Sequence, residues 1–120
     1  MKHPGSKSES EEERNNELLK TYRRLISETD YIVPAAIYEK LVNEPSSRFW
    51  VTEERAAVII SKMRKGHSLE RMHPSKQEMF QEIYRRAMIL MEQDKSLSVF
   101  EVAMKVVCQP APKFYISPGY

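Results

Sequence analysis

The feature that most constrains the fold of this chain is an internal repeat. Residues 37–52 (IYEKLVNEPSSRFWVT) match residues 102–117 (VAMKVVCQPAPKFYIS) at an offset of 65 positions. Four of the sixteen aligned pairs are identical, and most of the others keep the same chemistry. The identical pairs are Lys40 with Lys105, Val42 with Val107, Pro45 with Pro110, and Phe49 with Phe114. A repeat of this length predicts two related structural units.

A second match lies upstream of the first. Residues 22–24 and 84–86 both read Tyr-Arg-Arg, at an offset of 62 positions. The three-residue difference between the offsets fits a slightly longer loop in the second copy. Each tyrosine is expected in a core with its arginines reaching outward, although the arginines are also candidates for phosphate contact or for an ion pair between units.

Length and composition indicate one domain or two very small ones. The chain has 120 residues, and its hydrophobic fraction of 41% allows only a modest core. The two units are therefore expected to pack on each other or on a partner. No apolar run approaches the roughly 20 residues that span a bilayer, no secretory signal is recognisable, and the single cysteine suits a reducing compartment. We expect a cytoplasmic protein without membrane contact.

The local pattern predicts an all-α fold in which each unit resembles a helix-turn-helix unit. Residues 1–12 are expected to be a flexible polar tail, followed by a first unit over 13–66, a linker over 67–74 and a second unit over 75–120. Expected helices cover residues 11–27, 34–43 and 53–65, then 75–93 and 98–108. Thr52 and Ser98 are expected N-caps, Ser75 begins a capping box, and Gly66 stops a helix. Because the chain stops at Tyr120, the second unit is expected to lack its last helix.

The last helix of the first unit holds the candidate binding residues. Arg55, Lys62 and Lys65 fall on one face, since seven residues return a helix nearly to the same direction. Arg64 lies to one side of that face, and Arg48 precedes the helix. Such a stripe predicts contacts with the phosphates of duplex DNA, and a solvated basic surface is the alternative.

Two features of the same region argue against sequence-specific reading of DNA. Glu53 and Glu54 lie in the first turn of the helix, where they would repel phosphate, and the preceding linker is longer than a compact helix-turn-helix allows. The pairs Phe49-Trp50 and Phe114-Tyr115 permit base stacking, but an aromatic plug between helices is the preferred interpretation.

Enzyme chemistry finds little support in the sequence. His3, His67 and His73 do not combine with Cys108 in a zinc-ligand spacing, and no glycine-rich phosphate loop is present. Cys108 is expected to be a buried, inert thiol. We therefore predict no catalytic residue, no cofactor and no metal.

Two segments resemble small uncharacterised proteins from prophages and mobile elements of gut Bacteroidetes. They are RFWVTEERAAVIISKM and QPAPKFYISPGY, and the most specific motif is the block at 45–52 and 110–117. In such relatives the second block continues into a basic helix, which is missing here. The resemblance implies a bacterial or phage intracellular protein and supplies no catalytic residue.

Two function classes follow from these observations. The first is a non-enzymatic DNA-binding protein, a regulator or accessory factor of a phage or mobile element. The alternative is a protein-interaction or assembly module that forms a homo-oligomer or docks another protein through the incomplete second unit, with residues 97–120 buried between chains.

Overall fold

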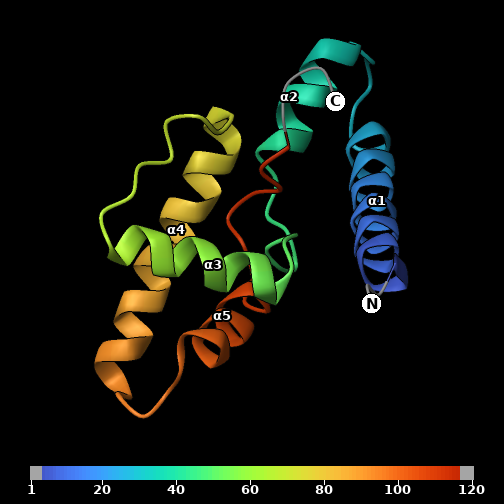
Figure 1. The fold of residues 1–120 in the computed structure, drawn as a ribbon. Helices are drawn as coiled ribbons and strands as arrows, with labels where there is room; N and C mark the ends of the chain where they lie inside the picture. The colour runs from blue at the N-terminus through green and yellow to red at the C-terminus, as the bar shows by residue number, and fades with distance from the viewer. Residues whose placement is uncertain (1–3, 117–120) are drawn as a thin grey trace.

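A computed structural model gives the backbone of residues 4–116, with side chains described from Glu11 onward. Five helices and no β-strand form in this range, which confirms the prediction of an all-α fold. The helices are α1 (Pro4–Ser27), α2 (Pro34–Val42), α3 (Glu53–Arg64), α4 (Pro74–Gln93) and α5 (Val99–Val107) (Figure 1).

Short-range capping chemistry sets most of the helix ends. The Thr52 side chain accepts a hydrogen bond from the Arg55 amide at the start of α3. Ser98 and Glu101 form a reciprocal capping box at the start of α5, which satisfies amides that the helix itself cannot. Gly66 follows α3 with a φ of 86°, a conformation that only glycine adopts at little cost. These three predicted helix ends are confirmed.

Two helices begin differently from the prediction. α1 starts at Pro4, so residues 4–12 are helical, whereas the polar composition predicted a flexible tail there. A polar composition argues against burial, but extending an existing helix costs far less than nucleating one. α4 starts at Pro74, and its N-cap is His73, whose Nδ1 accepts from the Ser75 amide. The predicted Ser75 cap is therefore wrong, because Pro74 already fits the first helical position.

The helices form two lobes, each with its own core. The α1–α2 lobe contains α1, α2 and the end of the described chain, and the α3–α5 lobe contains the other three helices (Figure 1). The buried residues of the α1–α2 lobe are Leu18, Leu25, Ile37, Leu41, Phe114 and Ile116. The buried residues of the α3–α5 lobe are Phe49, Ala56, Ile59, Ile60, Met79, Phe80, Ile83, Ala87, Val102, Ala103, Val106, Val107 and Ala111. The second core is larger, so it supplies most of the hydrophobic stabilisation.

The segments that follow α2 and α5 cross each other between the lobes. Ser46 and Ala111 exchange two backbone hydrogen bonds, of 3.0 and 2.9 Å, in an isolated antiparallel bridge. Phe49, which follows α2, is buried in the α3–α5 lobe. Phe114, which follows α5, is buried in the α1–α2 lobe. Each crossing segment therefore anchors its own end in the lobe on the other side.

This crossing changes how α3 is used. α3 packs on α4 and α5 and makes no close helix contact with α1 or α2. Residues 13–66, expected to form a complete first unit, therefore do not pack as three helices around one core. The second unit, expected to lack a third helix, has α3 against α4 and α5. The physical reason is the linker before α3, which is long enough to reach the other lobe, and the burial of Phe49 draws it there.

The cysteine also differs from its prediction. Cys108 is exposed, at the C-cap position of α5. Its apolar neighbours Val106 and Val107 face the core, but the residue after them lies past the last helical turn, where the chain turns outward.

Candidate nucleic-acid interface

Helix α3 has one buried face and one basic face. Ala56, Ile59 and Ile60 are buried against α4 and α5. Their spacing places them on a single stripe of the helix. The opposite side of α3 is exposed to solvent and carries most of its charged residues.

Four of the five predicted binding residues lie on this exposed part of α3 or just after it. Arg55, Lys62, Arg64 and Lys65 are all exposed. Within residues 11–116, no ion pair involves any of the four. An unpaired, solvated cation can approach a phosphate without first breaking a salt bridge. The structure thus brings these four side chains to one region of the surface.

Arg48 is used differently from the prediction. It is half-buried, and its guanidinium donates to the Phe49 and Val51 carbonyls at 3.1 and 3.3 Å. The same group lies 5.1 Å from the centre of the Trp50 ring, a favourable cation–π distance. These contacts hold the crossing segment in shape, so a role in phosphate contact is not favoured for Arg48.

The positive charge of α3 is concentrated in its second half. Glu53 and Glu54 occupy the first turn, where the helix dipole stabilises carboxylates. Lys62, Arg64 and Lys65 lie at the other end. A polyanion is therefore expected to meet the C-terminal half of the helix.

An open groove lies beside the first turn of α3. It has a volume of about 550 Å³ and draws its lining from α1, from the crossing segment, from α3 and from α4. The lining residues are Glu11, Arg14, Trp50, Val51, Thr52, Arg55 and Lys76. Three cations and one carboxylate therefore surround one half-buried indole. Sequence reasoning found only Arg55 of the three cations, because nothing in the local pattern indicates that α1 and α4 approach the start of α3.

The four aromatic residues of the crossing segments separate into buried and accessible ones. Phe49 and Phe114 are fully buried, as the interpretation of aromatic plugs predicted. Tyr115 stacks on Phe49 with ring centres 6.1 Å apart, and burial raises the pKa of Tyr115 to about 12. Trp50 is half-buried, donates from Nε1 to the Ser46 hydroxyl at 2.8 Å, and lines the groove. Of the four rings, Trp50 is the one placed to meet a ligand there.

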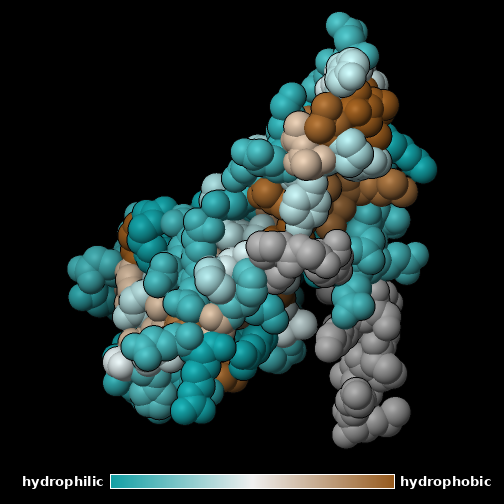
Figure 2. All heavy atoms as spheres, turned by 90° about the horizontal axis from the view of Figure 1, so that it is seen from above, coloured by the Kyte–Doolittle hydropathy of each residue, from teal (hydrophilic) through white to brown (hydrophobic). Residues whose placement is uncertain are grey.

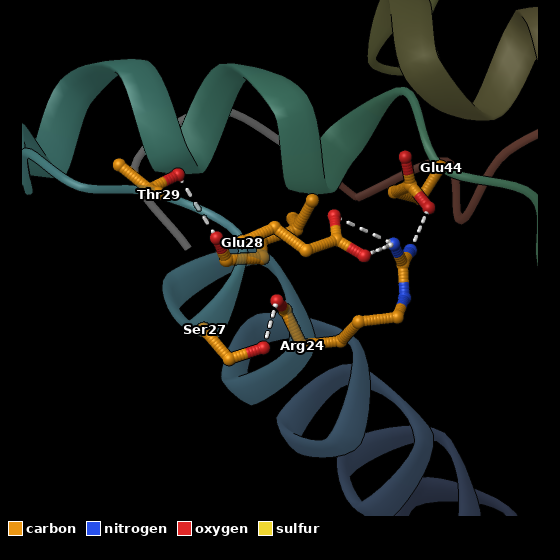
Figure 3. A network of polar contacts seen from close by, with 6 residues as sticks. Arg24, Ser27, Glu28, Thr29 and Glu44 are labelled. Atoms are coloured by element: carbon orange, nitrogen blue, oxygen red, sulfur yellow. Dashed lines mark hydrogen bonds and ion pairs between the residues drawn. The ribbon is translucent and has the colours of Figure 1, made fainter.

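The two Tyr-Arg-Arg motifs serve the architecture. Arg24 bonds to Glu28 in its own helix and to Glu44, which follows α2 (Figure 3). Arg86 bonds to Gln109 at 3.1 Å and to the Pro110 carbonyl at 2.8 Å, just after α5. In each case the second arginine of the motif ties a long helix to the residue after the short helix.

The remaining chemistry of the described chain is sparse. No cluster of three or more His, Cys, Asp or Glu residues in residues 11–116 is arranged to hold a metal ion. None of the helices in the described range combines the length and the apolar character needed to cross a bilayer.

Comparisons with known proteins add no assignment. No protein-family model matches the chain, and no curated protein and no solved structure shows significant similarity to it. The basic side of α3 and the neighbouring groove are therefore the observations on which a function has to be based.

Proposed function

We propose that this protein is a non-enzymatic nucleic-acid-binding protein that contacts the phosphate backbone of duplex DNA through α3. The observation that carries the proposal is the set of exposed cations without acidic partners in the described chain: Arg55, Lys62, Arg64 and Lys65. A regulator or accessory factor of a phage or mobile element, acting in the cytoplasm, fits this chemistry and the resemblance noted above.

The contact is proposed to be with phosphates and not with base edges. The outward face of α3 also presents Glu54 and Val58, and neither forms the paired hydrogen bonds by which side chains distinguish bases. Lysine and arginine on a rigid helix can fix a protein on a duplex without reading its sequence. Binding with weak sequence preference follows.

We also propose that the chain arose from a duplicated helix–helix–linker unit. The bounds of α5 are those of α2 displaced by 65 residues, the offset of the sequence repeat. Ser46 and Ala111, which bond to each other, are separated by the same number. Glu44 and Gln109, the partners of Arg24 and Arg86, are again 65 residues apart. These coincidences support two related units that interlock through their crossing segments, and α3 is the helix appended to the first.

The DNA-binding proposal predicts a specific loss on charge reversal. The double variant Lys62→Glu/Lys65→Glu is expected to bind random duplex DNA at least about tenfold more weakly at low salt, because two phosphate contacts become repulsive. The dependence of log K on log salt should also fall by about two contacts. Fluorescence anisotropy with a labelled duplex over a salt series measures both quantities.

A matched control for this variant is Lys40→Glu/Lys105→Glu. These two lysines are also exposed and lie on α2 and α5, so the change in net charge is the same. The control should retain most of the affinity, and a thermal melt should show all three proteins equally folded. Equal weakening by both double variants, or binding that ignores salt, would contradict the proposal.

A second candidate function is an assembly module, and the exposed apolar side chains favour it. Tyr31 and Ile32, in the turn between α1 and α2, are 80% and 56% exposed. Figure 2 shows hydrophobic side chains gathered over the α1–α2 end of the face seen from above. On α5, Phe100 and Met104 are exposed one helical turn apart. Such groups mark contact sites when they cluster.

The assembly hypothesis predicts a dimer that either patch can disrupt. Tyr31→Ser/Ile32→Ser and Phe100→Ser/Met104→Ser are each expected to leave folding intact, since all four side chains are exposed. The variant that removes the true interface should shift light-scattering mass from dimer to monomer at micromolar concentration. A monodisperse wild-type monomer at high concentration would remove this candidate.

A further inference from the structure

Resting on the nucleic-acid-binding function proposed above, we propose that the groove beside the first turn of α3 binds unpaired nucleotides of a single strand, with a base against Trp50 and its phosphates on Lys76, Arg55 and Arg14. This site is separate from the C-terminal half of α3, where the duplex backbone is proposed to lie. The ligand class is a single-stranded nucleic acid.

The lining of the groove has the composition that single-strand binding needs. Proteins that bind single strands combine a positive groove along the backbone with aromatic rings on which bases stack. Here the cations come from three helices and converge on an indole. The Val51 side chain adds apolar surface beside the ring, and Arg48 holds the indole from its own segment. A ring held in this way loses little freedom when a base stacks on it.

The size and shape of the groove favour an unpaired strand over a duplex. Its volume of about 550 Å³ lies within the roughly 300–1,000 Å³ of pockets that take small ligands. One or two nucleotides are of this scale, whereas a duplex keeps its bases stacked inside the helix. A paired base would have to be unstacked to reach Trp50, at a cost of a few kcal/mol. An unpaired base reaches it without that cost.

The one carboxylate in the lining sets the position of the phosphates. Glu11 lies on α1 and is exposed, and it repels a phosphate placed on its side of the groove. Arg55 and Lys76 come from α3 and α4. The backbone is therefore expected to run closer to these two helices than to the start of α1.

The test uses Trp50 itself as the reporter, since it is the only tryptophan of the chain. A short oligothymidylate, and an oligouridylate in parallel, is titrated into the full chain while tryptophan emission is followed. Stacking on the indole is expected to quench the emission saturably, and the same titration with a blunt duplex should leave it nearly unchanged. Lys76→Glu should weaken the single-strand affinity about tenfold, because one contact becomes repulsive.

Lys40→Glu, an exposed lysine of α2 with the same change in charge, is the matched control and should leave the quench unchanged. Arg55→Glu is a second variant, and it retains the fold because glutamate suits the third position of a helix that begins with Thr52. Absence of quench with either single strand, equal quench by the duplex, or equal weakening by Lys40→Glu would each overturn the inference.

The outcome is separable from that of the proposed function. If Lys62→Glu/Lys65→Glu loses duplex affinity and no oligonucleotide quenches Trp50, the groove proposal alone fails. If the quench occurs and responds to Lys76→Glu but duplex affinity is absent, the duplex proposal alone fails.

Discussion

Replacing Phe49 with alanine is expected to remove about 3–5 kcal/mol from the free energy of unfolding, the range found when a fully buried aromatic is truncated. The Phe49 ring is 1% exposed. It stacks on Tyr115, and the Arg86 guanidinium lies 4.9 Å from its centre. The substitution removes the ring and leaves a cavity where the crossing segment enters the α3–α5 lobe. Since a domain of this size has only about 5–15 kcal/mol in total, the variant should be marginally folded.

Urea denaturation followed by far-UV circular dichroism measures this loss. Phe100→Ala is the control, because that ring is 44% exposed and its removal should cost less than about 1 kcal/mol. Phe49→Leu fills part of the cavity and should recover some of the lost stability. A Phe49→Ala protein as stable as Phe100→Ala would show that the crossing segment does not anchor the lobe.

The second large effect is expected at Arg86, whose replacement with alanine should cost about 2–3 kcal/mol. Its guanidinium is mostly buried and donates to the Glu82 carboxylate at 2.7 Å, as well as to Gln109 and to the Pro110 carbonyl. Removing it leaves these acceptors unsatisfied and releases the segment after α5 from α4. Arg85 is the matched control. It also pairs with Glu82, but it is largely exposed, so Arg85→Ala should cost no more than about 1 kcal/mol.

The same cluster predicts an acid dependence of stability. Hydrogen bonds from Arg85 and then Arg86 hold the pKa of Glu82 at about 2, below its ordinary value of 4.5. A carboxylate whose pKa is lower in the folded state stabilises the fold above its unfolded pKa, and this contribution is lost as the pH falls from about 4.5 towards 2. Comparing unfolding near neutrality and at about pH 3 should show a smaller acid-induced loss in Arg86→Ala than in the wild type. An identical loss in both would mean that the pair does not act as described.

Arg86 and Phe49 together explain why the crossing segments matter for function as well as for stability. Phe49 fixes the chain just before Trp50, and α3 starts three residues after Phe49 has entered the core. The position of the indole and the direction of α3 therefore depend on the same anchor. A loosened anchor is expected to displace both the proposed groove and the basic side of α3.

The sequence by itself predicted what local chemistry controls. The caps at Thr52 and Ser98 and the glycine at position 66 define helix ends through bonds between near neighbours, so they can be read without knowing the fold. The apolar stripe of α3 likewise predicted which side of that helix is buried. The exposure of Lys62, Arg64 and Lys65 follows from the same periodicity.

Only the tertiary structure decided where those elements go. The linker before α3 permits packing on either lobe, and the choice is made by the burial of Phe49 against α4 and α5, which no local pattern reveals. For the same reason the groove could not be predicted: Arg14, Arg55 and Lys76 are far apart in the chain and meet because three helices converge. Local hydrogen bonds fix the elements of this protein, whereas burial of side chains distant in sequence fixes their arrangement and, with it, the surface available for binding.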